Sequence, residues 1–253
     1  MFIRAASLVC VLALAAILVP SHVDAATTVR ITMAGGAGSF DIELNDNTPL
    51  QRDNFLQYVQ AGKYANTVFH RSDNQINVLQ GGGFTLPANP NTSFLDNVVT
   101  YAPVTYEGNL GWPNDIRTVG AARGSDPDSA TSQWYINMAD NRSILDDSVR
   151  SGNGYTVFGK IVSGWDVAVK LFAAKAWDWS RVLASDPIGP ALTTLPLWSS
   201  WDGGRWPMQD EFLTIQSADE VLPAPATGSV PEPATMAMLA LGLGGLVMRG
   251  RRK

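Results

Sequence analysis

The sequence predicts a mainly β domain, built as a barrel or a sandwich of short strands, that also contains two helices. In residues 27–44, apolar and polar residues alternate on both sides of a glycine-rich turn, which is the pattern of a hairpin. Between residues 68 and 158, short apolar runs are separated by clusters of Gly, Pro, Asn and Asp, as expected for short strands joined by turns. Two further segments repeat their apolar residues at helical spacing.

Local signals place the two helices. The first is expected to begin at Thr48 and Pro49, where a hydroxyl can cap the helix and a proline can occupy its first position. It would bury Phe55 and end near Gly62, because glycine readily adopts the conformation that ends a helix. The second helix is expected within residues 163–172.

The chain after the second helix follows no simple period. Residues 173–204 are rich in tryptophan and proline and fit neither a helix nor a strand pattern. Residues 212–215 are expected to form the last strand. We therefore expect one domain over about residues 27–222, with an elaborated excursion before its closing strand.

Residues 1–25 have the pattern of a cleaved secretory signal peptide. Arg4 supplies a basic start, residues 8–19 form an apolar run, and residues 23–25 offer the small residues that a signal peptidase recognises. The alternative is a membrane anchor, but this apolar run is too short to span a bilayer comfortably. We therefore expect an exported protein.

The C-terminal region is expected to be a linker followed by a sorting tail. Residues 223–229 are rich in small residues and proline and cannot pack a core. The tail, residues 230–253, combines a Pro-Glu-Pro motif, a short apolar run and a basic end. As a helix this run would be roughly 22 Å long, against the ~30 Å core of a bilayer, which counts against a plain membrane anchor.

This tail resembles the PEP-CTERM sorting signal of Gram-negative bacteria. The resemblance implies that an exosortase-type processing enzyme recognises and removes it during export. We expect the protein to be held transiently at the inner membrane and to end in the periplasm, the cell envelope or outside the cell.

Cysteine and histidine are too scarce for much of ordinary active-site chemistry. The single cysteine, Cys10, and one of the two histidines, His22, lie in the signal segment, so His70 is the only histidine expected in the mature chain. Disulfides, thiolate metal sites and multi-histidine sites are then excluded. A Ser-His-Asp triad would have to use His70. We expect no metal and no cofactor.

The charge distribution argues against nucleic acid as a partner. The formal net charge is −5, but the basic tail carries +3, which leaves −8 on the rest of the chain. A surface with that negative excess repels a phosphate backbone.

Three motifs carry the remaining chemistry. They are Phe-His-Arg at residues 69–71 followed by Gln-Gly-Gly-Gly-Phe at 80–84, Ala-Ala-Arg at 121–123 followed by the stretch 128–137, and residues 154–160. Each is ambiguous alone: an isolated arginine is usually a surface cation, and aromatic runs are usually core. The glycine triplet is no phosphate loop, because no Gly-Lys-Ser/Thr follows it.

Together these motifs resemble the cyclophilin family of peptidyl-prolyl cis-trans isomerases, particularly its bacterial periplasmic members. The resemblance covers about residues 29–172, and the stretch 128–137 is nearly diagnostic. It implies an eight-stranded antiparallel barrel with two capping helices. It also implies isomerisation of X-Pro bonds, here in exported polypeptides that are folding.

The resemblance also implies a set of site residues. Arg71 matches the catalytic arginine, and Gln80 matches the glutamine that holds it in place. His70 matches a structural histidine, so we do not expect it to act as a general base. The substrate-binding positions are Val78, Ala122, Gln133, Tyr135, Leu145 and Tyr155.

The chain departs from the family pattern at the pocket wall. One extra residue lies between Arg71 and Gln80, and residues 74–77 replace the usual Pro-Gly-Phe, so the aromatic wall is missing or replaced by Ile76. Trp134 and Tyr135 stand where the family has two phenylalanines.

The implied reaction suits these residue types. Resonance holds the X-Pro bond planar behind a barrier of about 18–20 kcal/mol, and no covalent bond has to be made or broken. A guanidinium that donates to the imide nitrogen interacts more strongly with the twisted state than with the planar state, and this lowers the barrier. Arginine suits the role because it stays charged and presents a fork of donors.

The sequence leaves two alternatives to an isomerase function. One is a proline-binding or scaffold module of the extracellular matrix with little turnover. The other is a carbohydrate-binding wall protein, suggested by the eight tryptophans and the tail. For the leading interpretation we expect proline-containing polypeptides as partners and a monomeric protein.

Overall fold

The computed structural model describes residues 26–89, 93–108, 110–203 and 205–221. The predicted signal peptide, linker and sorting tail therefore lie outside the described residues. Within the described ranges, no helix has both the length and the apolar character needed to cross a membrane.

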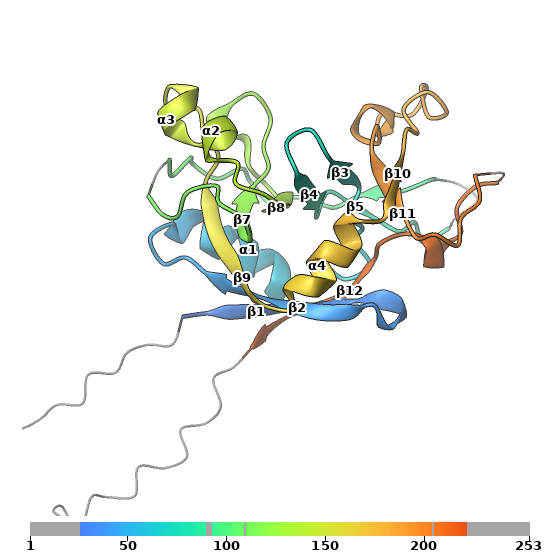
Figure 1. The fold of residues 1–253 in the computed structure, drawn as a ribbon, viewed down its shortest axis with the longest axis horizontal. Helices are drawn as coiled ribbons and strands as arrows, with labels where there is room; N and C mark the ends of the chain where they lie inside the picture. The colour runs from blue at the N-terminus through green and yellow to red at the C-terminus, as the bar shows by residue number, and fades with distance from the viewer. Residues whose placement is uncertain (1–25, 90–92, 109, 204, 222–253) are drawn as a thin grey trace, which may run out of the picture.

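One antiparallel sheet of eight strands forms the body of the domain (Figure 1). In spatial order its strands are β12 (Ile215–Val221), β1 (Thr28–Met33), β2 (Gly38–Leu44), β9 (Val157–Ser163), β7 (Thr118–Ala121), β8 (Trp134–Asn137), β4 (Val78–Gly81) and β3 (Arg71–Asp73). The glycine-rich turn between β1 and β2 forms a short 3-10 helix, η1 (Ala34–Gly36). The predicted mainly β class and the eight antiparallel strands are confirmed.

Backbone hydrogen bonds join the two edges of this curled sheet. The N–H of Phe69 donates to the carbonyl of Leu213 (3.0 Å), and the N–H of Ile215 donates to the carbonyl of Thr67 (2.7 Å). These residues lie at or just before the starts of β3 and β12, so the sheet curls toward a barrel. The prediction that the last strand covers residues 212–215 is wrong, because residues 212–214 pair with the chain near Val68 and Leu197 and the strand begins only at Ile215.

Strand alternation fills the interior of the sheet with apolar side chains. Every second residue of a strand faces the same side, so β1 and β2 each send three side chains inward. These six are all at most 1% exposed: Val29, Ile31, Met33, Phe40, Ile42 and Leu44. Aromatic rings complete the core, with Trp134 meeting Phe69 edge-on at a centroid distance of 5.4 Å.

Two helices of eight or more residues pack on this core. They are α1 (Pro49–Gln60), which buries Phe55 and Tyr58, and α4 (Trp165–Phe172), which buries Ala168 and Leu171. Figure 1 shows α4 in front of the sheet and α1 behind it. Two one-turn helices that the sequence patterns did not predict, α2 (Arg142–Leu145) and α3 (Asp147–Arg150), follow β8, and a short 3-10 helix η2 (Pro127–Ser129) precedes it.

The first helix begins where predicted but is capped by a different residue. The hydroxyl of Thr48 donates to the carbonyl of Asn45 (3.2 Å) and makes no capping bond to the helix. The buried carboxylate of Glu107 instead accepts hydrogen bonds from the backbone N–H groups of Leu50 (3.0 Å) and Gln51 (2.8 Å). A negative charge at this end also interacts favourably with the helix dipole. The loop that carries Glu107 is thereby fixed to α1.

The excursion after α4 packs beside the barrel on a core of its own. Strand β10 (Lys175–Trp177) pairs with β11 (Leu195–Leu197), and two 3-10 helices, η3 (Gly189–Ala191) and η4 (Gln209–Glu211), lie in the connecting loops. A small ladder of β5 (Phe84–Thr85) and β6 (Asp96–Asn97) adjoins it. The shared hydrophobic cluster contains Val68, Phe84, Leu95, Trp179, Leu183, Ile188, Leu192, Leu195, Leu197, Trp201 and Phe212.

The capping role of Glu107 predicts a measurable loss of stability. Glu107→Ala leaves two helix N–H groups without their acceptor, so the free energy of unfolding should fall by about 1–2 kcal/mol in urea titrations. Glu107→Gln keeps one carbonyl acceptor and should lose less. An alanine variant as stable as the parent protein would show that this carboxylate does not cap α1.

Candidate active site

A row of residues across four adjacent strands forms the base of the site. Strand register places Arg71 opposite Gln80, Gln80 opposite Tyr135, and Tyr135 opposite Gly120. Side chains two positions apart on a strand share a face, so Val78 of β4 lies on the same side of the sheet as Gln80. The residues between them, such as Leu79 and Ile136, are buried on the core side.

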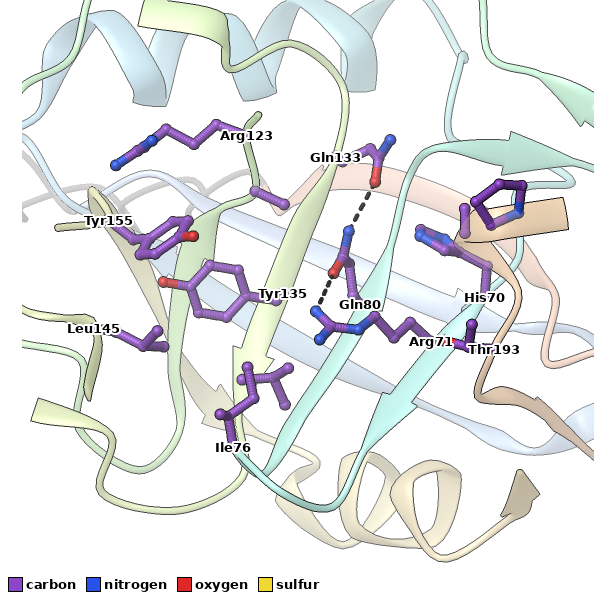
Figure 2. Close-up of a pocket in the computed structure, with 14 residues that line it drawn as sticks. His70, Arg71, Ile76, Gln80, Arg123, Gln133, Tyr135, Leu145, Tyr155 and Thr193 are labelled. Atoms are coloured by element: carbon purple, nitrogen blue, oxygen red, sulfur yellow. Dashed lines mark hydrogen bonds between the residues drawn. The ribbon is translucent and has the colours of Figure 1, made fainter. Parts of the chain in front are cut away.

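The site is a cavity of about 390 Å³ (Figure 2). The structure brings all eight of the residues named from the family resemblance to its walls: Arg71, Val78, Gln80, Ala122, Gln133, Tyr135, Leu145 and Tyr155. Their individual roles stay predictions. The remaining lining comes from His70, Ile76, Arg123, Pro190, Ala191 and Thr193.

A chain of hydrogen bonds orders the polar side of the cavity. Nη1 of Arg71 donates to Oε1 of Gln80 (3.2 Å), and Nε2 of Gln80 donates to Oε1 of Gln133 (2.8 Å). Figure 2 shows the three side chains end to end along one wall. The second amide fixes which way the first one points, so the carbonyl oxygen of Gln80 faces the guanidinium.

Asp73 is a part of the site that the sequence motifs did not reveal. Its Oδ2 accepts a hydrogen bond from Nη2 of Arg71 at 2.5 Å, and both side chains are partly buried. The two residues lie at positions i and i+2 of β3 and so share a face. That spacing was visible in the sequence and could have identified the pair.

Two glycines directly after β4, Gly82 and Gly83, allow the chain to pass close to residues 132–134. A Cβ on Gly83 would lie 2.7 Å from Cδ of Gln133, and a Cβ on Gly82 would lie 2.6 Å from the carbonyl oxygen of Ser132. Gly82 also has a φ of 78°, in the region that favours glycine. Gly82 and Gly83 are therefore required by the close approach of these two segments.

Apolar side chains line the other side of the cavity. Val78, Ala122, Tyr135 and Leu145 form a buried cluster, and Ile76 and Tyr155 pack against it. Of the two alternatives, a missing aromatic wall or its replacement by Ile76, the position of Ile76 in the lining favours the second. Leu145 and Tyr155 are joined by a backbone hydrogen bond of 3.0 Å, which fixes this wall as one unit.

Tyr135 forms the floor of the pocket, and its hydroxyl is hydrogen-bonded to a residue outside the cavity lining. The hydroxyl of Tyr135 donates to Oδ1 of Asn114 (2.6 Å), and Nδ2 of Asn114 donates to Oδ1 of Asp146 (2.8 Å). Burial raises the pKa of Tyr135 well above 10, so the group stays a donor. Gly120 makes room for this ring, since a Cβ there would lie 2.4 Å from the tyrosine oxygen. The tyrosine thus keeps its apolar ring face in the pocket while its hydroxyl is satisfied elsewhere.

Arg123 lines the cavity and was not among the predicted site residues. Its Nη2 donates to the carbonyls of Asn153 (2.7 Å) and Gly154 (2.8 Å), and its guanidinium lies 4.7 Å from the ring centroid of Tyr155. These contacts tie the loop before β9 to the chain after β7. Arg123 therefore fixes the position of Tyr155 at the rim.

His70 lies against the core side of the cavity. It is 1% exposed, its ring meets Phe84 edge-on at 4.8 Å, and its Nδ1 has no hydrogen-bond partner among the described residues. Burial, with a smaller contribution from the charge of Arg71, lowers the pKa of His70 to about 4. The ring is therefore neutral at neutral pH.

The described residues offer little for a metal. No group of three or more His, Cys, Asp or Glu side chains within them is arranged to hold an ion.

The buried, neutral His70 predicts a loss of stability in acid. The unfolded chain binds a proton at this residue below its ordinary pKa of about 6.5, whereas the folded protein does so only near pH 4. This contribution to stability is therefore complete above pH 6.5 and is lost as the pH falls toward 4, by about 3 kcal/mol in all. Between pH 7 and pH 4.5, the unfolding free energy of His70→Gln should fall by about 2–3 kcal/mol less than that of the parent protein. Identical pH dependence in the two proteins would contradict this assignment.

Most of the domain matches one protein family, and the C-terminal residues match a sorting motif. Residues 28–190 match the family described as "Cyclophilin type peptidyl-prolyl cis-trans isomerase/CLD", and residues 229–253 match the "PEP-CTERM protein-sorting motif". A peptidyl-prolyl cis-trans isomerase of Acinetobacter baylyi is 38% identical over 159 residues, which cover 62% of this chain and 78% of the relative. Peptidyl-prolyl cis-trans isomerase A of Dickeya dadantii is 40% identical over 148 residues, 58% of this chain and 73% of the relative.

Solved structures support the fold. The crystal structure of a cyclophilin-type peptidyl-prolyl cis-trans isomerase from Cryptosporidium parvum superposes with a TM-score of 0.53 at 18% identity, covering 79% of this chain and all of that one. The shared sheet and the family match over most of the domain lead to one conclusion. The chain belongs to the cyclophilin-type peptidyl-prolyl cis-trans isomerase family and carries a PEP-CTERM sorting motif at its C-terminus.

Proposed function

We propose that this isomerase acts on X-Pro bonds of exported polypeptides while they fold, and that the cavity beside Arg71 is where it does so. One observation carries the proposal: a fixed guanidinium lies along one wall of a cavity whose opposite wall is an apolar pocket. Such a cavity can hold the proline ring on one side and act on the bond before it on the other.

The apolar pocket would hold the proline ring. The ring has no N–H and fits an apolar surface, so Val78, Leu145 and the ring face of Tyr135 can bury it without leaving a donor unpaired. With the ring held, the chain on the other side of the X-Pro bond is free to rotate.

Arg71 would stabilise the twisted bond. Two of its five N–H donors are used in the hydrogen bonds to Gln80 and Asp73, and the others remain available to a substrate. As the bond twists, the imide nitrogen regains its lone pair and becomes an acceptor. A donor already fixed beside it stabilises the twisted state more than the planar state, because the side chain does not have to reorganise.

The sorting motif supports export as the setting. The match at residues 229–253 suggests sorting to the cell envelope, with an exosortase-type enzyme as the processing partner. We infer a mature domain of about residues 27–222 and a linker at 223–229 between it and the tail. Clients would then be proline-containing polypeptides that fold after translocation.

Replacing Arg71 tests the proposed mechanism. In a protease-coupled assay on a tetrapeptide with one X-Pro bond, Arg71→Ala should lower kcat/KM by about 100-fold or more, as for other preorganised donors. Arg71→Lys should recover only a small part, because an ammonium lacks the planar fork of donors. Urea unfolding of both variants should remain close to that of the parent protein, since this side chain is partly exposed.

Two outcomes would count against the proposal. If Arg71→Ala kept nearly full activity, the donor would have to be another group. If the parent protein bound the peptide without accelerating its isomerisation, the cavity would be a proline-binding module with little turnover.

The proposed processing can be followed by mass spectrometry of the exported protein. We expect an N-terminus near Ala26 and a C-terminus close to the Pro-Glu-Pro motif. Glu232→Ala should block release and leave the protein in the inner-membrane fraction. Recovery of an exported form that still carries Arg251, Arg252 and Lys253 would favour a plain membrane anchor.

A further inference from the structure

A second cavity lies on the excursion, away from the catalytic one. It has a volume of about 320 Å³, and four of the eight tryptophans of the chain line it. Its lining is Trp177, Asp178, Trp179, Val182, Trp201, Gly203, Arg205 and Trp206, none of which borders the catalytic cavity.

The indole rings of this tryptophan pocket are held by one another. Trp177 meets Trp201 edge-on at 4.5 Å between centroids, Trp201 lies 5.3 Å from Trp179, and Trp179 lies 5.7 Å from Trp206. Trp179 and Trp201 are largely buried and form the base, while Trp206 is 56% exposed and Val182 is 62% exposed. Large exposed apolar side chains gathered around a hollow are typical of a binding surface.

Polar contacts fix the loop that carries two of these rings. The indole N–H of Trp201 donates to the carbonyl of Arg205 (2.7 Å). The guanidinium of Arg205 makes two hydrogen bonds of 2.7 Å to the carboxylate of Glu211, which is 1% exposed and also accepts from the N–H of Met208. The pocket is therefore formed before any ligand arrives, which reduces the cost of binding.

The two cavities are built on opposite sides of one segment. The backbone N–H of Trp179 donates to the carbonyl of Leu192 (2.9 Å), and residues 190, 191 and 193 line the catalytic cavity next to Arg71. Figure 2 shows Thr193 beside Arg71. The N–H of Ser72 in turn donates to the carbonyl of Thr194 (2.9 Å), which fixes this segment to the catalytic strand.

We propose that the tryptophan pocket is a second binding site for the polypeptide substrate, and that it holds an extended, proline-containing segment of the same chain whose X-Pro bond is in the catalytic cavity. The inference rests on the proposed function. A client with two separated proline segments should then bind to this protein more tightly than a client with a single proline.

The chemistry of the pocket favours a proline segment over a charged ligand. A polyproline-type segment is extended, has no internal hydrogen bonds and docks on aromatic grooves at little cost in conformational entropy. The charged residues of the lining are already engaged, Arg205 with Glu211 and Asp178 with the N–H and hydroxyl of Ser180. The pocket therefore offers ring faces more than an unpaired charge.

Two linked sites make a testable difference between short and long substrates. Once one segment is bound, the other binds as if at millimolar concentration, provided that the connecting residues can span the distance. The wild-type protein should be assayed with a tetrapeptide containing one X-Pro bond and with a series of longer peptides. Each longer peptide joins five consecutive prolines to the N-terminal or the C-terminal side of the tetrapeptide through a spacer of two to eight glycines and serines. We expect a KM at least about 10-fold lower for the best long peptide than for the tetrapeptide.

Substitutions in the tryptophan pocket should remove only the difference in KM between the long peptide and the tetrapeptide. Trp206→Ala and the surface substitution Val182→Asp should raise the KM for the long peptide to that for the tetrapeptide and leave kcat/KM for the tetrapeptide unchanged. Trp112→Ala is the matched control, because Trp112 lies outside both cavities and stacks with Lys160. It should leave both substrates unaffected. Urea unfolding checks that each variant is folded.

Three results would overturn the inference. The first is an equal KM for all peptides with the parent protein, and the second is a preference for the long peptide that survives in both Trp206→Ala and Val182→Asp. The third is quenching of tryptophan fluorescence by soluble xylan but not by the proline-rich peptide, which would assign the pocket to carbohydrate. Absence of activity on the tetrapeptide would instead contradict the proposed function.

Discussion

The site depends on holding the positive charge of Arg71 in a fixed position at the wall of a cavity whose other side is apolar. A guanidinium removed from water is costly unless a partner and hydrogen bonds compensate it. Asp73 supplies the opposite charge to Arg71, and Gln80 supplies a neutral acceptor. The two bonds use one N–H of Nη1 and one of Nη2, so three of the five N–H donors of Arg71 are left for other partners. The alternation of β3 provides the carboxylate two residues away without any additional structure.

The same carboxylate also stabilises the segment that departs from the family pattern. Oδ2 of Asp73 holds Arg71, while its Oδ1 accepts the backbone N–H groups of Gln75 (2.8 Å) and Ile76 (3.3 Å). The turn closes at Asn77, which adopts a φ of 48°, a conformation that asparagine tolerates better than most residues. One side chain therefore couples Arg71 to the wall residue Ile76. The altered turn and the ordered arginine form one unit.

The parts of this structure that the sequence predicts are those governed by local patterns. Alternation in residues 27–44 and the signals around Pro49 correspond to β1, β2 and α1, and the family motifs name eight residues that share one cavity. The missed features depend on contacts between distant residues. Glu107 caps a helix 57 residues earlier, and residues 212–214 leave the strand because their partners are at Val68 and Leu197. The excursion follows no period because its rings pack on one another.

If Arg71 acts as proposed, Asp73 affects the reaction through Arg71. A double-mutant cycle on kcat/KM tests this coupling with the parent protein, Asp73→Asn, Arg71→Ala and the double variant. Asparagine keeps an oxygen that can accept from the turn N–H groups, and it replaces the charged acceptor of Arg71 with an amide nitrogen that cannot accept. We expect a loss of about 10-fold or more for Asp73→Asn when Arg71 is present and almost none when it is absent, a coupling above about 1 kcal/mol. The same loss in both backgrounds, or no loss in either, would contradict it.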